Sequence, residues 1–152
     1  MHFEVIIIMN IRQRLNKMNN ELNGLYHDIS VKLGLSDSES MVMYMLYDTQ
    51  EPLTQSDIVK ATGLSKQTLN SAIRKLEKEG VIILEKINEK SKKIVMTEKG
   101  QVLIAQKIKP LVDMEDHVLD TWTEEDRLKY LELVEKFKEQ FEKEVNAYDK
   151  RQ

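Results

Sequence analysis

The stretch that decides the fold is residues 54–80, which read TQSDIVKATGLSKQTLNSAIRKLEKEG. This pattern indicates two short helices joined by a tight turn. Thr54 and Ser65 are residue types that cap helix starts, and Asp57 favours a helix start three residues after Thr54. Gly63 can adopt the left-handed conformation that ends the first helix. We therefore predict a helix-turn-helix.

The second of these helices has two chemically different faces before Gly80 ends it. Its buried face should carry the apolar residues that recur at helical spacing, which are Leu69, Ala72, Ile73 and Leu76. Its opposite face carries only side chains that can donate a hydrogen bond: Lys66, Gln67, Thr68, Asn70, Ser71, Arg74 and Lys75. A helix with an apolar back and a donor-rich front suits the major groove of DNA.

A polar hairpin is predicted directly after this helix. Two runs rich in β-branched residues, at 81–87 and 94–97, flank the basic segment 88–93, which reads NEKSKK and forms the expected tip. A helix-turn-helix followed at once by such a hairpin is a winged helix. The helix would enter the major groove, and the wing would lie along the backbone or in the minor groove.

Each polar side chain of this unit has an expected role on DNA. Base edges would be contacted by Gln67, Thr68 and Ser71. Phosphate would be contacted by Lys66, Arg74 and Lys75, although Arg74 could also reach a guanine. Ser65 would cap the helix and could donate to phosphate. The wing would be held to the duplex by Lys90, Lys92 and Lys93.

The chain resembles the MarR family of bacterial transcription regulators in four short motifs: LTQ, GLS, LEKEGV and TEKG, at residues 53–55, 63–65, 76–81 and 97–100. The resemblance covers nearly the whole chain, because long helices flank the winged unit as they do in that family. It implies a homodimer that binds double-stranded DNA. It also implies a small-molecule effector, often aromatic or anionic, bound between the dimer helices and the DNA lobes.

The wing tip departs from the family pattern. That family usually carries Asp-x-Arg-Asp-x-Arg at this place, whereas residues 88–93 contain three lysines and no arginine. Arginine is weakly hydrated and suits a narrow minor groove, while lysine is a strongly hydrated point charge on a flexible stem. We therefore expect this wing to contact phosphate rather than insert into the minor groove.

The charge of the chain is unevenly distributed. The whole chain of 152 residues carries a formal charge of −3. Residues 53–97 contain nine basic and five acidic side chains, a net charge of +4, so the remainder carries −7. A basic module on an acidic frame can orient itself on phosphate. The alternative is a chance excess of lysine on a solvated surface.

Long amphipathic helices are expected on both sides of the winged unit. We predict a mainly α fold with a small β-hairpin wing, in a single domain covering residues 1–152. Residues 36–97 would form the DNA-binding lobe, and residues 1–35 and 98–152 the dimerisation helices. The apolar stripes of the terminal helices need a partner, which an intertwined homodimer would supply. Two recognition helices about one DNA turn apart would suit a palindromic site. The alternative is a monomeric bundle with its arms folded back.

Three further segments carry local expectations. The helix containing residues 41–47 is apolar nearly all round and should be buried in the middle of the domain. Pro110 lies within a helical pattern and should kink or split that helix. The apolar run at residues 1–9 is too short to span a bilayer, and we interpret it as an extension that packs on the partner subunit or frays.

Other functional classes find little support in the sequence. There is no nucleophile elbow, Gly-rich phosphate loop or HExxH motif, so neither an enzyme nor a cofactor is expected. The chain contains no cysteine, which is compatible with a reducing cytoplasm. We expect a cytoplasmic repressor that does not bind membranes. An alternative for a winged helix is a protein-interaction module without specific DNA binding.

Metal and ligand sites remain open at this stage. His27 and His117 each adjoin carboxylates and could serve a metal-responsive regulator, although roles on the helix surface are the favoured interpretation. An effector pocket could include four aromatic residues, which are Tyr26, Tyr44, Tyr47 and Trp122. The favoured alternative for these is core packing with their polar ends bonded.

Overall fold

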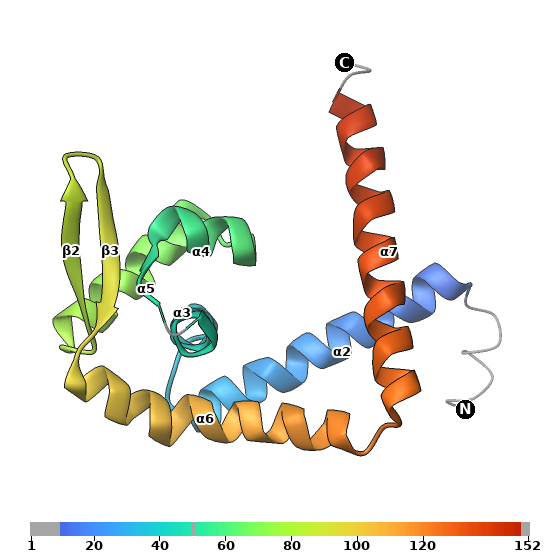
Figure 1. Cartoon of the computed structure of the whole chain (residues 1–152), viewed down its shortest axis with the longest axis horizontal. Coiled ribbons are helices and arrows are strands. Elements are labelled where there is room, and N and C mark those ends of the chain that lie inside the picture. Colours follow the sequence, from blue (N-terminus) through green and yellow to red (C-terminus); the bar gives the residue numbers. More distant parts are fainter. Residues whose placement is uncertain (1–9, 50, 150–152) are drawn as a thin grey trace. The chain divides into compact units, whose positions relative to one another are not determined.

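The computed structural model describes residues 10–49 and 51–149 and is mainly helical (Figure 1). The apolar run at residues 1–9 lies outside the described residues. The elements follow in the order α2 (Ile11–Lys32), α3 (Asp37–Thr49), β1 (Leu53–Thr54), α4 (Gln55–Thr62), α5 (Lys66–Lys78), β2 (Ile82–Asn88), β3 (Ser91–Met96), α6 (Glu98–Asp120) and α7 (Glu124–Asp149). This arrangement confirms the predicted fold class, a winged helix-turn-helix between long helices.

The described residues fall into two compact units, divided between Leu111 and Val112. This division lies within α6, one residue after Pro110. The predicted split of the helix at Pro110 is wrong, because α6 runs continuously from Glu98 to Asp120. Proline removes a single backbone donor, and the neighbouring helical hydrogen bonds can hold the helix together on both sides of it. The expectation of a single domain stays a prediction.

The helix starts of the central unit are capped as the sequence indicates. The Asp57 N–H donates to the Thr54 hydroxyl over 3.2 Å, and the Thr54 N–H donates to the Asp57 carboxylate over 2.9 Å. The Thr54 hydroxyl also donates to the Asp57 carboxylate over 2.6 Å, and this bond first and the Thr54 N–H bond second hold the pKa of Asp57 below its ordinary value. Gly63 has a φ of 69° and ends α4. Ser65 caps α5 by accepting from the Thr68 N–H over 3.1 Å.

The wing is a longer hairpin with a shorter tip than the sequence suggests. β2 and β3 pair antiparallel, with Leu84 opposite Ile94 and Lys86 opposite Lys92. The expected tip at residues 88–93 is wrong, because β2 extends to Asn88, β3 begins at Ser91, and only residues 89–90 form the turn. Charged side chains point away from the ladder and leave the backbone hydrogen bonds intact, so a polar sequence did not prevent strand pairing. The short strand β1 pairs with the other edge of β3 and was not expected.

The core of the lobe lies where α3, α5, α6 and the base of the wing meet. The predicted apolar face of α5 is confirmed, since Leu69, Ala72, Ile73 and Leu76 are all buried. They pack with buried residues from the surrounding elements, among them Val42, Met43, Leu46, Ile82, Ile94, Ile104 and Ile108. The prediction that residues 41–47 are buried all round is only partly right. Met41 is 38% exposed and Tyr44 is half-buried, because the packing of α3 against α2, α4 and α5 leaves part of its surface uncovered.

The C-terminal end of α5 is fastened to the start of α6. The Thr97 hydroxyl lies 2.6 Å from the Gly80 carbonyl oxygen and accepts from the Gly100 N–H over 3.0 Å. The Thr97 N–H donates to the Val81 carbonyl over 3.1 Å. Gly100 lies so close to the backbone just before β2 that an added Cβ would stand 2.1 Å from the Val81 carbonyl oxygen. Two of the motifs that carry the family resemblance, at residues 76–81 and 97–100, therefore contact each other directly.

The outer helices of the two units expose apolar residues. On α2 these residues recur every three or four positions at Ile11, Leu15, Met18, Leu22 and Leu25, and each is about half exposed or more. On α7 none of the residues with described burial is buried, and both Phe137 and Phe141 are more than half exposed. Exposed apolar residues in such number and spacing are typical of surfaces for protein–protein contact.

Candidate nucleic-acid interface

The exposed residues of α5 divide into three rows when the helix is followed at 3.6 residues per turn. The row opposite the buried face contains Gln67, Ser71, Arg74 and Lys78, and we call it the front row. Lys66 and Asn70 lie on the flank that faces the wing. Thr68 and Lys75 lie on the other flank, where Lys75 reaches α3.

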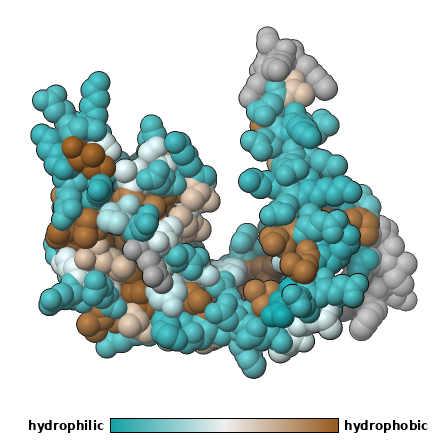
Figure 2. All heavy atoms as spheres, viewed as in Figure 1, coloured by the Kyte–Doolittle hydropathy of each residue, from teal (hydrophilic) through white to brown (hydrophobic). Residues whose placement is uncertain are grey.

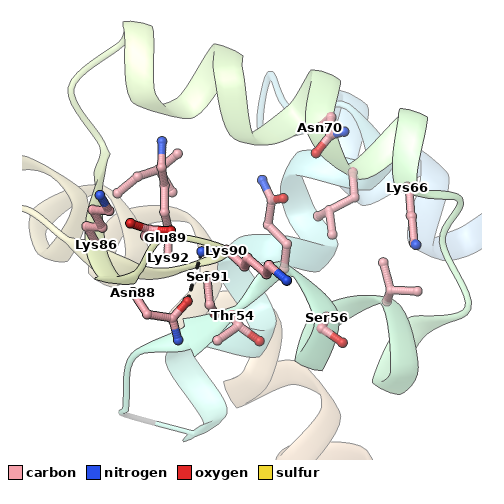
Figure 3. Close-up of a pocket in the computed structure, with 14 residues that line it drawn as sticks. Thr54, Ser56, Lys66, Asn70, Lys86, Asn88, Glu89, Lys90, Ser91 and Lys92 are labelled. Carbon is pink, nitrogen blue, oxygen red and sulfur yellow. Dashed lines mark hydrogen bonds between the residues drawn. The ribbon is translucent and has the colours of Figure 1, made fainter.

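A groove of about 550 Å³ lies between the start of α4, the wing-facing flank of α5 and the wing (Figure 3). We call it the wing groove. The close-up shows Lys66 and Asn70 descending from α5, Thr54 and Ser56 on the opposite side, and the wing residues closing the third side. Its charged residues are Lys66, Lys86, Lys90, Lys92 and Glu89. Four ammonium groups and one carboxylate give the groove a strong preference for an anion.

The register of the wing explains how these lysines come together. Leu84 and Ile94 form an opposed pair, and Ile94 is buried, so this pair faces the core. Lys86 and Lys92 form the next pair on the same face, because side chains alternate along a strand. Two ammonium groups directly opposite one another repel. A bound anion would relieve that repulsion. The end of the wing is hydrophilic in the surface view (Figure 2).

The structure places the predicted DNA contacts in different settings. Gln67, Ser71 and Arg74 lie together in the front row, although the Ser71 hydroxyl donates to the Gln67 carbonyl over 3.1 Å. The hydroxyls of Ser65 and Thr68 lie 2.8 Å apart and bond to each other at the helix cap. Lys66 and Asn70 enter the wing groove, as do Lys90 and Lys92.

Two predicted contacts point elsewhere. Lys93 follows Lys92 directly on β3, so it faces the other side of the wing, where it pairs with Glu85 across the ladder. The Lys75 ammonium donates to the Glu39 carboxylate over 2.9 Å.

The sequence reasoning missed two basic residues on these surfaces. Lys86 lines the wing groove, and strand alternation would have placed it there once its pairing with Lys92 was known. Lys78 continues the front row four residues after Arg74, which the helical period alone could have shown. Lys86 belongs to none of the four motifs that carry the family resemblance, and Lys78 lies within one of them, LEKEGV.

The residues considered for an effector pocket are dispersed. Tyr26 is 46% exposed on α2, and Tyr44 and Tyr47 are half-buried on α3. Trp122 belongs to the second unit, where its ring meets Tyr130 edge-on with centroids 5.4 Å apart. The wing groove is lined by none of these four. Their role in ligand binding stays a prediction.

The residues considered for a metal site are also separated. His27 Nδ1 lies 3.0 Å from both carboxylate oxygens of Asp37, in the first unit. His117 lies on the part of α6 that belongs to the second unit. Within residues 10–49 and 51–149, no three or more His, Asp or Glu side chains gather in a way that could hold a metal ion. Among the same residues, no helix is long and apolar enough to cross a membrane.

Comparisons with known proteins agree with this geometry. A family model described as the MarR family matches residues 33–90, which include the helix-turn-helix and most of the wing. An uncharacterised HTH-type transcriptional regulator of Bacillus cereus is 26% identical over 131 residues, which are 86% of this chain and 88% of that protein. The fold is therefore a winged helix-turn-helix, and the chain is similar to such regulators.

Solved structures extend the match over nearly the whole chain. NMB1585, a MarR family regulator from Neisseria meningitidis, superposes with a TM-score of 0.81 at 20% identity and covers 91% of this chain and 99% of its own. A MarR family regulator from Listeria monocytogenes, solved with a 26mer DNA, gives a TM-score of 0.71 at 24% identity and covers 88% and 89%. The chain is thus similar to MarR family regulators, by the family model over residues 33–90 and by its fold over nearly the whole chain.

Proposed function

We propose that this chain is a homodimeric, sequence-specific regulator that represses transcription by binding a palindromic DNA site. The observation that carries the proposal is the wing groove beside the front row of α5. Four lysines gather in the groove against one glutamate. A DNA strand has the matching charge for such a groove, and its neighbouring base edges would meet the front row.

The two surfaces have different tasks in this proposal. The groove lysines Lys66, Lys86, Lys90 and Lys92 neutralise phosphates and set the orientation of the lobe on the duplex. Gln67, Ser71 and Arg74 read base edges, because they occupy the row that points directly away from the core. Asn70 lies between the two surfaces, where it reaches either the backbone or a base next to it.

Dimerisation is proposed from the exposed apolar rows of α2 and α7. A lone chain would leave these rows in water, whereas a second copy of the same chain presents the same rows for burial. A two-fold dimer also presents two α5 helices to one face of the duplex, which accounts for a palindromic site. Repression follows if the site overlaps a promoter, and the DNA target places the protein in the cytoplasm.

Release by a small molecule is the part of the proposal supported by the resemblance to the MarR family alone. Tyr26 and Tyr47 remain the residues of choice for testing it, because both combine an aromatic ring with partial exposure. An aromatic or anionic compound that dissociates the protein from its selected site would support an effector. If the dissociation constant for the DNA site stayed the same in the presence of every compound of such a panel, the protein would be a regulator without a small-molecule effector.

The test of DNA binding is the salt dependence of affinity for a duplex of random sequence. We expect log K to fall steeply with log salt, by about 0.9 for each neutralised phosphate. Lys86→Met should make the slope shallower, because it removes a groove charge without a base contact. Lys60→Met is the matched control, since Lys60 is exposed on α4 outside the groove and should leave the slope unchanged. Equal slopes for wild type and Lys86→Met would reject the groove as the phosphate site.

The competing function is a protein-docking winged helix. It is distinguished by the same titration, because a docking module binds random duplex weakly and without a steep salt dependence. The clustering of like charges at Lys86 and Lys92 favours DNA, since a docking surface has no need of opposed ammonium groups.

A further inference from the structure

A nearly inaccessible carboxylate lies under the flank of the recognition helix. Glu39 belongs to the first turn of α3 and is only 1% exposed. It takes part in a capping box, in which the Ser36 N–H donates to Glu39 Oε2 over 3.0 Å and the Glu39 N–H donates to the Ser36 hydroxyl over 3.2 Å. Glutamate is almost never fully buried without a charged partner, so this site requires a cation.

Lys75 of α5 supplies that cation. Its ammonium donates to Glu39 Oε2 over 2.9 Å and lies 2.9 Å from Oε1, which accepts no hydrogen bond itself, so the contact with Oε1 is electrostatic. Burial acts to raise the pKa of Glu39, but bonds from Ser36 and Lys75 outweigh it and hold that pKa below its ordinary value. Glu39 in turn raises the pKa of Lys75, with a weaker contribution from Glu79. Both partners are therefore charged at neutral pH.

The pair has a distinct place on the recognition helix. Lys75 follows Arg74 by one residue and therefore points about 100° away from it around the helix axis. Arg74 belongs to the front row, whereas the Lys75 ammonium is held against the start of α3. The pair thus joins two helices whose sequence positions lie 36 residues apart.

We propose that Glu39 is a positioning residue for base readout and that Lys75 is its anchor on α5 rather than a phosphate contact. The proposal rests on the proposed function as a DNA-binding regulator. The ion pair fixes the rotation of α5 about its own axis, which decides where Gln67 and Ser71 point. Base readout tolerates only small displacements of a side chain, whereas attraction to phosphate is diffuse. Loss of the pair should therefore lower specificity more than general affinity.

The experiment uses the full chain and two duplexes, one of random sequence and one carrying the site selected from genomic DNA. The variants are Glu39→Gln, Lys75→Met, and both together, with Lys92→Met as the comparison. Glutamine can replace glutamate in a capping box, so Glu39→Gln removes the charge and keeps the cap. The double variant removes both charges and leaves no buried carboxylate without a partner, which protects the test if Lys75→Met alone fails to fold.

Salt slopes on the random duplex decide the role of Lys75. We expect Lys92→Met to lower the slope by about 0.9 per lost contact, and Lys75→Met and the double variant to leave it unchanged. A slope that fell for the double variant as much as for Lys92→Met would show that Lys75 contacts phosphate, and the proposal would be dropped. A wild type without any salt slope would instead overturn the proposed function.

Affinity for the selected site decides the role of Glu39. Glu39→Gln should lower it by about tenfold while changing affinity for the random duplex by less than about twofold. The double variant should show the same loss, because it too lacks the ion pair that orients the recognition helix, and recovery of specific affinity in it would show that the unmatched charge, not the missing pair, caused the loss. An unchanged ratio of specific to random affinity in Glu39→Gln would show that the pair stabilises the lobe without positioning the recognition helix.

Discussion

Replacing Phe141 by alanine should separate the proposed dimer. Phe141 is 59% exposed on α7 and stacks on Phe137, with ring centroids 5.9 Å apart. An aromatic side chain buries roughly 200 Å² in full, so a partner could cover about 120 Å² more of this one. At about 25 cal/mol per Å² this area contributes about 3 kcal/mol, of which truncation to alanine loses about 2 kcal/mol.

The two-fold symmetry of the dimer doubles this loss. Both copies of Phe141 change together, so the free energy of association should weaken by about 4 kcal/mol, or about a thousandfold in the dimer dissociation constant. Sedimentation equilibrium over a nanomolar to micromolar series measures this constant directly. Lys138→Ala is the matched control, because Lys138 is exposed on the same helix beside the apolar row.

Two results would refute this reasoning. If the wild-type protein stayed monomeric at micromolar concentration, the proposed dimer would be refuted. A dimer whose dissociation constant was the same for wild type, Phe141→Ala and Lys138→Ala would show that α7 does not form the contact. If the reasoning holds, Phe141→Ala should also weaken binding to the selected DNA site, because one lobe alone reads half of it.

Three further outcomes follow from other residues. Gln67→Ala should cost about 1–3 kcal/mol on the selected site and much less on random DNA, and an equal loss on both would remove Gln67 from the base readers. Gly100→Ala should destabilise the fold by about 1–3 kcal/mol in urea unfolding, because its Cβ would meet the Val81 carbonyl, whereas Gly24→Ala, with no atom within 4 Å of its added Cβ, should not. Glu39 has a folded-state pKa below its unfolded value, so its charge stabilises the fold above the unfolded pKa and this contribution disappears as pH falls through the folded pKa. The difference in stability between wild type and Glu39→Gln should therefore shrink in acid, and a difference that persisted unchanged at pH 3 would contradict the assigned shift.

Local features of the fold could be predicted from the sequence because their causes lie within a few residues. The caps at Thr54 and Ser65 each depend on a partner three residues away. The buried face of α5 follows from a period that the helix geometry fixes. Only the order of these elements, and not any single motif, indicated a winged helix.

Features that depend on distant partners could not be predicted in the same way. The place of Lys86 in the wing groove follows from its register with Lys92, which the hairpin turn sets. The engagement of Lys75 depends on Glu39, a residue in a different helix. Lysine in a donor-rich row looked like a phosphate contact because the sequence shows its charge but not the carboxylate beneath it.

The predicted split at Pro110 is wrong for a related reason, whereas the alternative of a kink stays a prediction. A proline in a helical pattern removes one donor and crowds one carbonyl, and the neighbouring residues decide whether the helix continues. In this chain α6 continues through it for a further ten residues to Asp120.

The most direct test of the central claim is selection of bound fragments from genomic DNA by the purified full chain. If the front row of α5 reads bases in a two-fold dimer, the recovered fragments should share an inverted repeat. Its half-sites should have centres about 10 base pairs, or one helical turn, apart. Replacing Gln67 by alanine should lower the affinity of the protein for these fragments more than its affinity for random DNA. Recovery of fragments without a shared sequence, bound no better than random duplex, would contradict the account.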